Sequence, residues 1–185
     1  VTYETDGNGT VGSEETEYVS SKTEGVAYGE NAVGVTAKAN EGYYFVNWTD
    51  SEGNEVSTNP TYAPQNVTSN AIYRAHFAKQ AELTVTAGDL SKTYDGSAIE
   101  ADSTKYTLTS GDLQEGHELK VTTGVSTNVI NFGETGEHRI TDVKVVDTNN
   151  DGADVTYLYD IECMPGTLTI TQRPVTVTGY TYEGD

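Results

Sequence analysis

One stretch of the sequence has the oxygen-rich spacing of a calcium-binding loop. Asp147, Asn149 and Asp151 place side-chain oxygens at positions 1, 3 and 5 of such a loop, and Gly152 stands at position 6. The twelfth position is Leu158, where a bidentate Glu would complete the metal shell. Asn, Asp and Gly also tolerate the positive φ of a tight turn. We therefore interpret the segment as a hairpin turn and keep calcium binding by Asp147, Asn149 and Asp151 as the alternative.

The single cysteine and the three histidines show no catalytic or metal-binding spacing. Because Cys163 is the only cysteine and no histidine lies near it in sequence, we interpret it as a small apolar residue. A thioester or catalytic cysteine is the alternative. His76, His117 and His138 are scattered without HxxxH spacing, and each is expected at the surface. We expect no catalytic residue, no cofactor and no enzyme activity.

Two kinds of residue could contact a ligand. The Tyr-Asp-Gly motif at residues 94–96 could present a ring and a carboxylate, but Asp-Gly also makes a tight turn, which a repeat protein would contain in each copy. Tyr62, Tyr106 and Tyr157 could stack on sugars, although isolated tyrosines in strands usually pack on cross-strand neighbours. We favour the turn and the packing interpretations, and the ligand-binding residues stay unknown.

The elements that would position these residues are strands. Hydrophobic residues make up 35% of the chain and charged residues 21%, with 19 Gly, 13 Tyr and much Thr and Val, a composition typical of strands and turns. The net charge of −19 would repel phosphate backbones and anionic lipid, so nucleic acid is excluded as a partner. No apolar run is long enough for a membrane span, and no signal peptide or anchor is evident, so we expect no membrane insertion in this segment.

Residues 71–77 show the clearest strand alternation, with Ala71, Tyr73, Ala75 and Phe77 predicted on the core face. The other elements predicted in this part are turns at 6–9, 28–30 and 50–54, a strand near 33–37, and a hairpin that returns the chain at residue 55.

The densest aromatic stretch, residues 41–48, does not fit simple alternation. A regular strand would place Phe45 on one face and Trp48 on the other. Either both faces are partly covered, or a β-bulge turns Trp48 toward the same side as Phe45.

A second series of strands begins at Leu83, with Leu83 and Val85 on one face. The further predicted strands are 105–109, 118–122, 138–146, 155–161 and 166–171, and residues 110–116 offer at most one helical turn.

An internal repeat divides the chain. The sequence Leu-Thr-Val-Thr at 83–86 recurs as Val-Thr-Val-Thr at 175–178, and Thr-Tyr-Asp-Gly at 93–96 recurs as Thr-Tyr-Glu-Gly at 181–184. We therefore predict modules at 1–79 and 80–172, and the start of a further truncated repeat at 173–185. Their short joints predict an extended, semi-rigid arrangement.

Two family resemblances cover most of the chain. Residues 1–79 resemble the divergent internalin B-repeat, related to the Listeria–Bacteroides repeats, through Gly42-Tyr-x-Phe-x-x-Trp48, Asn59-Pro60 and the closing strand. In that family the aromatic residues form the core of a small β-grasp-like module, which favours the bulge. Residues 82–171 resemble the YDG/MBG-type repeats of bacterial surface proteins through Lys92-Thr-Tyr-Asp-Gly96 and Gly166-Thr-Leu-Thr-Ile170. These resemblances imply secreted, wall-associated proteins, typically of Gram-positive bacteria.

The sequence thus predicts an all-β protein, with minor α content at most, made of two tandem small β modules. The first is expected to be β-grasp-like and the second β-grasp-like or a β-sandwich. The predicted function is a non-catalytic structural or stalk segment of an adhesin-like repeat protein at the bacterial cell surface or cell wall, monomeric and extracellular. The alternatives are a module that binds host glycan or mucin, or an accessory domain of a secreted carbohydrate-active enzyme.

A host glycan or protein ligand would be bound through the full-length protein. A Lys-to-Asn amide crosslink would lower the intact mass by one ammonia.

Overall fold

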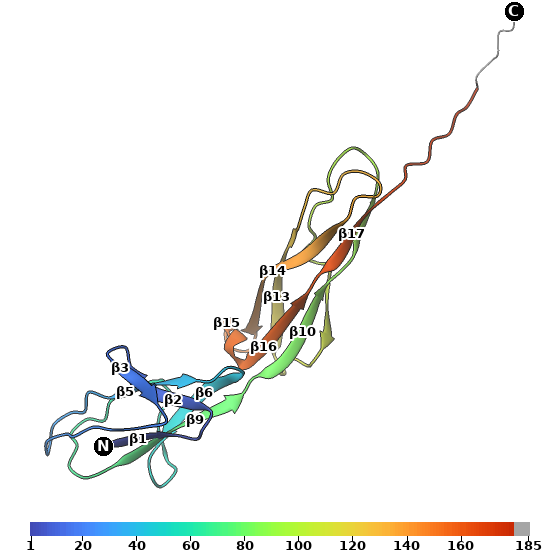
Figure 1. Cartoon of the computed structure of the whole chain (residues 1–185). Helices are drawn as coiled ribbons and strands as arrows, with labels where there is room; N and C mark the ends of the chain where they lie inside the picture. The colour runs from blue at the N-terminus through green and yellow to red at the C-terminus, as the bar shows by residue number, and fades with distance from the viewer. Residues whose placement is uncertain (180–185) are drawn as a thin grey trace, which may run out of the picture. The chain divides into compact units, whose positions relative to one another are not determined.

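The computed structural model describes residues 1–179 and consists almost entirely of β-strands, which confirms the predicted all-β fold class. Contacts divide the chain into two compact units. The first comprises Val1–Ala81 with Tyr157–Asp160, and the second comprises Glu82–Thr156 with the chain from Ile161 onward (Figure 1). The second copy of the Tyr-containing motif, residues 181–184 of the predicted truncated repeat, lies outside the described residues.

The first unit contains two sheets. Its strands are β1 (Thr2–Thr5), β2 (Gly9–Ser13), β3 (Thr16–Val19), β4 (Ser21–Thr23), β5 (Val35–Ala39), β6 (Tyr43–Thr49), β7 (Glu55–Ser57), β8 (Thr61–Tyr62) and β9 (Ile72–Lys79). One sheet has the order β4-β1-β9-β6-β7 and the other β3-β2-β5-β8. Strands β1 and β9, the first and last of the unit, pair in parallel, as in a β-grasp, and their other pairings are antiparallel.

The core of the first unit is aromatic. Trp48 is fully buried and its ring lies 6.0 Å from that of Tyr3 and 6.1 Å from that of Phe45. A bulge between Phe45 and Asn47 shifts the register of β6 against β9 and leaves the side chain of Val46 partly exposed. The predicted bulge is confirmed, because it lets Phe45 and Trp48 join the same core.

The predicted strand at 71–77 and the hairpin through 50–54 are confirmed as β9 and as the turn between β6 and β7. The strand near 33–37 begins later than predicted, at Val35, because Gly34 adopts a φ of +85° and leaves the Val33 side chain outside the strand. Strands β1 to β4 were not predicted, since each has five residues or fewer and lacks a clear alternation.

The second unit also contains two sheets. The elements from β10 onward are β10 (Ala81–Ala87), β11 (Leu90–Thr93), β12 (Tyr106–Ser110), β13 (His117–Val125), β14 (Gly136–Asp147), β15 (Ala153–Asp154), a 3₁₀ turn (Thr156–Leu158), β16 (Tyr159–Met164) and β17 (Gly166–Thr171). They belong to the second unit except for Ala81 and Tyr157–Asp160, which are grouped with the first. One sheet has the order β12-β10-β16 and the other β11-β17-β14-β13, with β15 beside β14. Strands β13 and β14 form a long hairpin next to β17 (Figure 1).

The alternation predicted for β10 is confirmed, because Leu83 and Val85 are buried. A second cluster joins Ile99, Val129 and the β17 residues Leu168 and Ile170.

The strand predicted at 155–161 is wrong in its first half. There, Asp154 Oδ1 accepts the backbone N–H of Thr156 at 2.9 Å, and the chain forms the 3₁₀ turn before β16 begins. The segment 110–116 forms the end of β12 and a turn instead of a helical turn.

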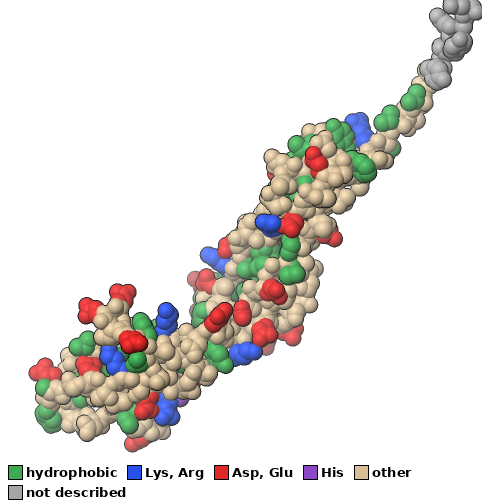
Figure 2. All heavy atoms as spheres, in the orientation of Figure 1, with side chains coloured by type: hydrophobic (Ala, Val, Ile, Leu, Met, Phe, Trp, Pro, Cys, Tyr) green, Lys and Arg blue, Asp and Glu red, His purple; other side chains and the backbone are tan. Residues whose placement is uncertain are grey.

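Acidic side chains are spread over the visible faces of both units rather than gathered at one place (Figure 2). This distribution agrees with the net charge of −19. It gives the protein a solvated acidic surface.

Candidate functional site

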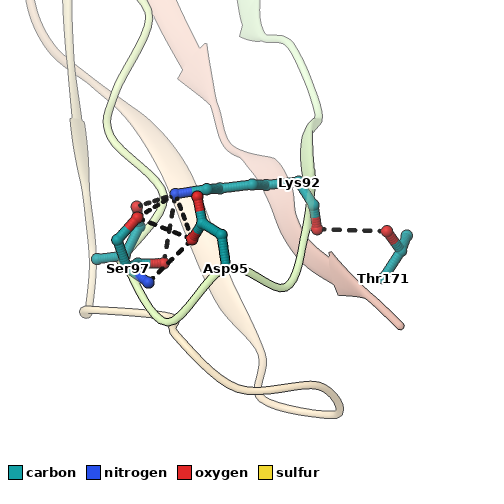
Figure 3. A network of polar contacts seen from close by, with 5 residues as sticks. Lys92, Asp95, Ser97 and Thr171 are labelled. Atoms are coloured by element: carbon teal, nitrogen blue, oxygen red, sulfur yellow. Dashed lines mark hydrogen bonds and ion pairs between the residues drawn. The ribbon is translucent and has the colours of Figure 1, made fainter. Parts of the chain in front are cut away.

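The Tyr-Asp-Gly motif of the second unit forms the turn that follows β11, as predicted (Figure 3). Asp95 Oδ1 accepts the backbone N–H of Ser97 at 2.9 Å and the Ser97 hydroxyl at 2.8 Å. Gly96 has a φ of +82°, which residues with a side chain rarely adopt. The Asp95 carboxylate therefore accepts its hydrogen bonds from within its own loop, while the ring of Tyr94 stays partly exposed.

Lys92 on β11 completes this loop (Figure 3). Its Nζ lies 3.0 Å from Asp95 Oδ1, donates to the carbonyl of Ala98 at 3.2 Å and contacts the Ser97 hydroxyl. The Ser97 N–H first, and Lys92 after it, lower the pKa of Asp95 to about 2. One indication of this arrangement is visible in the sequence, a Lys three residues before an Asp, but such a pair is too common to identify a site by itself.

The calcium candidates Asp147, Asn149 and Asp151 lie together in the hairpin turn between β14 and β15. Asp147 Oδ1 accepts the backbone N–H of Asn149 at 2.9 Å, and Gly152 N–H donates to the Asp147 carbonyl at 2.9 Å. Asp151 and Gly152 have φ values of 51° and 72°, so the predicted turn geometry is present. Within residues 1–179, no group of three or more His, Cys, Asp or Glu side chains is placed to hold a metal ion. Calcium binding stays a prediction to be tested.

The prediction that His138 lies at the surface is wrong, because its side chain is fully buried. Its Nδ1 is 2.7 Å from the Gly88 carbonyl oxygen, and its Nε2 is 3.3 Å from the backbone nitrogen of Asp102. Since the Asp102 N–H can only donate, Nε2 accepts and Nδ1 carries the proton that it donates to Gly88. Both ring nitrogens are satisfied, so His138 holds β14 to two loops of the same unit. His76 and His117 are partly exposed.

The first unit has an open polar depression of about 730 Å³ on the sheet that contains β1, β9 and β6. Arg74 pairs with Glu4 at 3.1 Å, and His76 Nε2 lies 2.9 Å from the Thr49 hydroxyl. Asp50, in the turn at its rim, accepts hydrogen bonds from Asn54 that lower its pKa. The polar groups here are largely paired with one another, and no Phe, Tyr or Trp is among the residues that line the depression.

The three tyrosines considered for sugar stacking have different environments. Tyr62 packs into the first core, 5.9 Å from the ring of Trp48 and 5.0 Å from that of Tyr73. Tyr106 is partly buried, and its hydroxyl lies 3.5 Å from the Leu119 carbonyl. Packing therefore explains both. Tyr157 is 57% exposed, although its ring also lies 5.9 Å from that of Tyr44.

Cys163 lies on β16 and is exposed, so its side chain does not serve the core as a small apolar residue would. Partial burial raises the pKa of its thiol. The thiolate that a nucleophile needs is therefore disfavoured. Glu137, Arg139 and Met164 are among its neighbours in a shallow depression, and no histidine lines it.

Residues 1–81 match the family model of the divergent InlB B-repeat domain, which confirms the resemblance of the first module. This part of the chain is similar to repeat domains of the InlB B-repeat type, and that type is typical of bacterial surface proteins. Comparison with curated proteins and with solved structures gives no match. Within residues 1–179, no helix is long and apolar enough to cross a membrane.

Proposed function

We propose that the chain is a non-catalytic spacer segment of a bacterial cell-surface protein, in which the second unit is a repeat of the YDG/MBG type. The observation that carries this proposal is the parallel pairing of strands near the two ends of each unit, β1 with β9 and β11 with β17. Parallel neighbours run in the same direction, so the chain enters a unit at one end of the sheet and leaves it at the other. A module with this topology adds its own length to a string of modules.

The joint between the units supports the proposal. Strand β9 ends at Lys79 and β10 begins at Ala81, so one residue, Gln80, connects them. A joint this short limits the conformations that the connection can adopt. The chain would therefore act as a series of connected modules. No residue is assigned a catalytic or ligand-binding role.

Surface display tests the spacer function. An epitope is placed on a bacterial surface scaffold directly, after the full chain, or after a compact single domain of equal residue number. We expect the full chain to increase labelling by a bulky antibody while labelling by a small antibody fragment stays the same. Equal antibody labelling for the full chain and for the compact domain would contradict the spacer function.

Exposed aromatic rings favour a second candidate, a glycan- or mucin-binding module, either of an adhesin or of a secreted carbohydrate-active enzyme. Tyr28 is 83% exposed, Phe132 61% and Tyr157 57%. Such rings can stack on sugar faces. A glycan array with the full chain and with Tyr28→Ala, Phe132→Ala and Tyr157→Ala variants separates the candidates, because a spacer binds no glycan and a lectin loses binding with the ring it uses.

A further inference from the structure

Each unit contains a parallel strand pair with four register partners, β1 with β9 and β11 with β17. In the first unit Thr2, Tyr3, Glu4 and Thr5 of β1 face Ile72 to Ala75 of β9. In the second, Leu90 to Thr93 of β11 face Leu168 to Thr171 of β17. Four residue pairs therefore connect β1 to β9, and four connect β11, the strand that follows β10, to β17.

The direction of these pairs decides how tension acts on them. Tension applied through the chain pulls β1 backward and β9 forward, along their common axis. In the second unit it reaches β11 through β10 and then pulls β11 and β17 in the same opposed directions. The hydrogen bonds of a pair loaded in this way share the force and must break together. In an antiparallel pair pulled apart from one end, each bond carries the force in turn, and the strands unzip.

Side chains reinforce the pair in the first unit. Glu4 and Arg74 are direct register partners and form an ion pair at 3.1 Å across β1 and β9. Just beyond the pair, Asp6 Oδ2 accepts the backbone N–H of Phe77 at 2.8 Å, and the Asp6 N–H donates to the Ala75 carbonyl at 3.2 Å. These contacts extend the pairing of β1 with β9 by one residue, Asp6, beyond Thr5.

Side chains reinforce the second unit at both ends of its pair. Asp89, just before β11, accepts the backbone N–H and the hydroxyl of Thr167 in β17, both at 2.8 Å. At the other end, the Tyr94 N–H donates to the Thr171 carbonyl at 2.9 Å, and the Thr171 hydroxyl lies 3.4 Å from the Lys92 carbonyl (Figure 3).

The first residue of β17, Gly166, lies in very close contact with the backbone of Ala87 and Gly88, where β10 ends and the chain turns toward β11. A Cβ at Gly166 would lie 2.4 Å from the Ala87 carbonyl oxygen and 2.6 Å from that of Gly88. Only glycine permits this approach.

We propose that β1/β9 and β11/β17 are shear clamps, so that each unit is a force-bearing module that resists tension applied between its ends. The proposal rests on the spacer function, to which it adds a mechanical role. A spacer that holds a cell against flow or surface movement is under tension through its chain, and forced unfolding is governed by the unfolding rate under load.

Single-molecule pulling of the full chain tests the proposal, with handles at both termini in a Cys163→Ser background. Full extension of the 78 residues from Thr2 to Lys79 releases about 280 Å, and that of the 90 residues from Glu82 to Thr171 about 320 Å, before the folded span is subtracted. The two unfolding events can therefore be assigned to their units by length.

Matched handle positions change the loading from shear to unzipping. For the first unit, handles at the N-terminus and at Gly25→Cys pull β1 and β4 apart from one end, since Thr2 faces Thr23. For the second, handles at Thr135→Cys and at the C-terminus pull β14 and β17 apart from one end, since Gly136 faces Leu168. Each unit should open at a force lower by about twofold or more than in end-to-end pulling. Equal forces in the two geometries would overturn the shear clamps.

Asp89→Ala tests the clamp of the second unit at one contact. It should raise the unfolding rate of that unit several-fold in end-to-end pulling, leave the first unit unchanged, and have little effect in the unzipping geometry. Asp89→Asn keeps the Oδ1 acceptor and should retain most of the resistance, and Asp142→Ala on the exposed surface of β14 is the matched control. An equal effect of Asp89→Ala in both pulling geometries would mean general destabilisation and would contradict the clamp. A spacer without clamps would still pass the surface-display test, so failure here and failure of the spacer function are distinguishable.

Discussion

Replacing His138 with alanine should destabilise the second unit and leave the first unchanged. The imidazole is fully buried and bridges the Gly88 carbonyl and the Asp102 N–H. Its removal leaves these two backbone groups without their partner and opens space beside β14. Each unpaired group costs about 1–3 kcal/mol, and partial access of water to Gly88 reduces the total to about 2–4 kcal/mol. A domain of about 100 residues is stable by about 5–15 kcal/mol, so this is a large fraction.

Urea titration followed by two probes measures this effect. Trp48 is the only tryptophan and is buried in the first unit, so its fluorescence reports that unit alone, whereas far-UV circular dichroism reports both. We expect the circular dichroism transition of the second unit to move to lower urea while the Trp48 transition stays in place. His138→Asn retains a donor for Gly88 and should lose about half as much stability. The reasoning is refuted if His138→Ala leaves every transition unchanged, or if it shifts the Trp48 transition instead.

Four further outcomes test other parts of the structure. Trp48→Phe removes the 3.1 Å hydrogen bond from the indole nitrogen to the Pro60 carbonyl and should cost the first unit about 1–3 kcal/mol in chemical denaturation. Gly9→Ala should destabilise the first unit by about 1–3 kcal/mol in the same assay, because the new Cβ would lie 2.3 Å from the ring of Phe77. The pKa of Asp95 is lowered from 3.8 to about 2, so the ionised carboxylate stabilises the second unit above pH 4, and this stabilisation is lost as the pH falls toward 2. An NMR titration of the carboxyl group should show the low midpoint. Asp95→Ala should reduce the acid sensitivity of the second unit. Melting curves in excess calcium and in chelator should coincide if the segment after β14 is only a turn, and a higher melting temperature in calcium would show the metal site instead.

The aromatic pattern of the first unit predicted its core and its bulge. Phe45 and Trp48 cannot share a face of a regular strand, so the sequence predicted either two covered faces or a bulge, and the register shift between Phe45 and Asn47 shows the bulge. Strands β1 and β4 could not be predicted in the same way. Their three or four residues alternate too briefly, and they exist because β9 and β1 provide paired neighbours.

Burial of His138 could not be predicted, because the groups that make it favourable lie far away in sequence. Gly88 is 50 residues distant and Asp102 is 36 residues distant. A polar side chain on a strand is expected to face solvent unless its partners are known. The exposure of Cys163 is the opposite case, in which a residue type that is usually buried lies on an open strand.

The 3₁₀ turn at Thr156–Leu158 shows how local side-chain bonding can override a strand pattern. Val155 and Tyr157 favour strand, but the Thr156 hydroxyl accepts the Val145 N–H at 2.9 Å, and the Thr156 N–H donates to Asp154 Oδ1. The competing interaction depends on the position of β14. Sequence periodicity alone therefore gave the wrong element.

The radius of gyration of the full chain in solution tests the central claim, that two units are strung together as a spacer, most directly. A single compact domain of 185 residues would have a radius of gyration of about 16 Å. Two compact units placed end to end would give about 20 Å or more. Small-angle X-ray scattering on the monomer should give the larger value, and a value near 16 Å would contradict the spacer function.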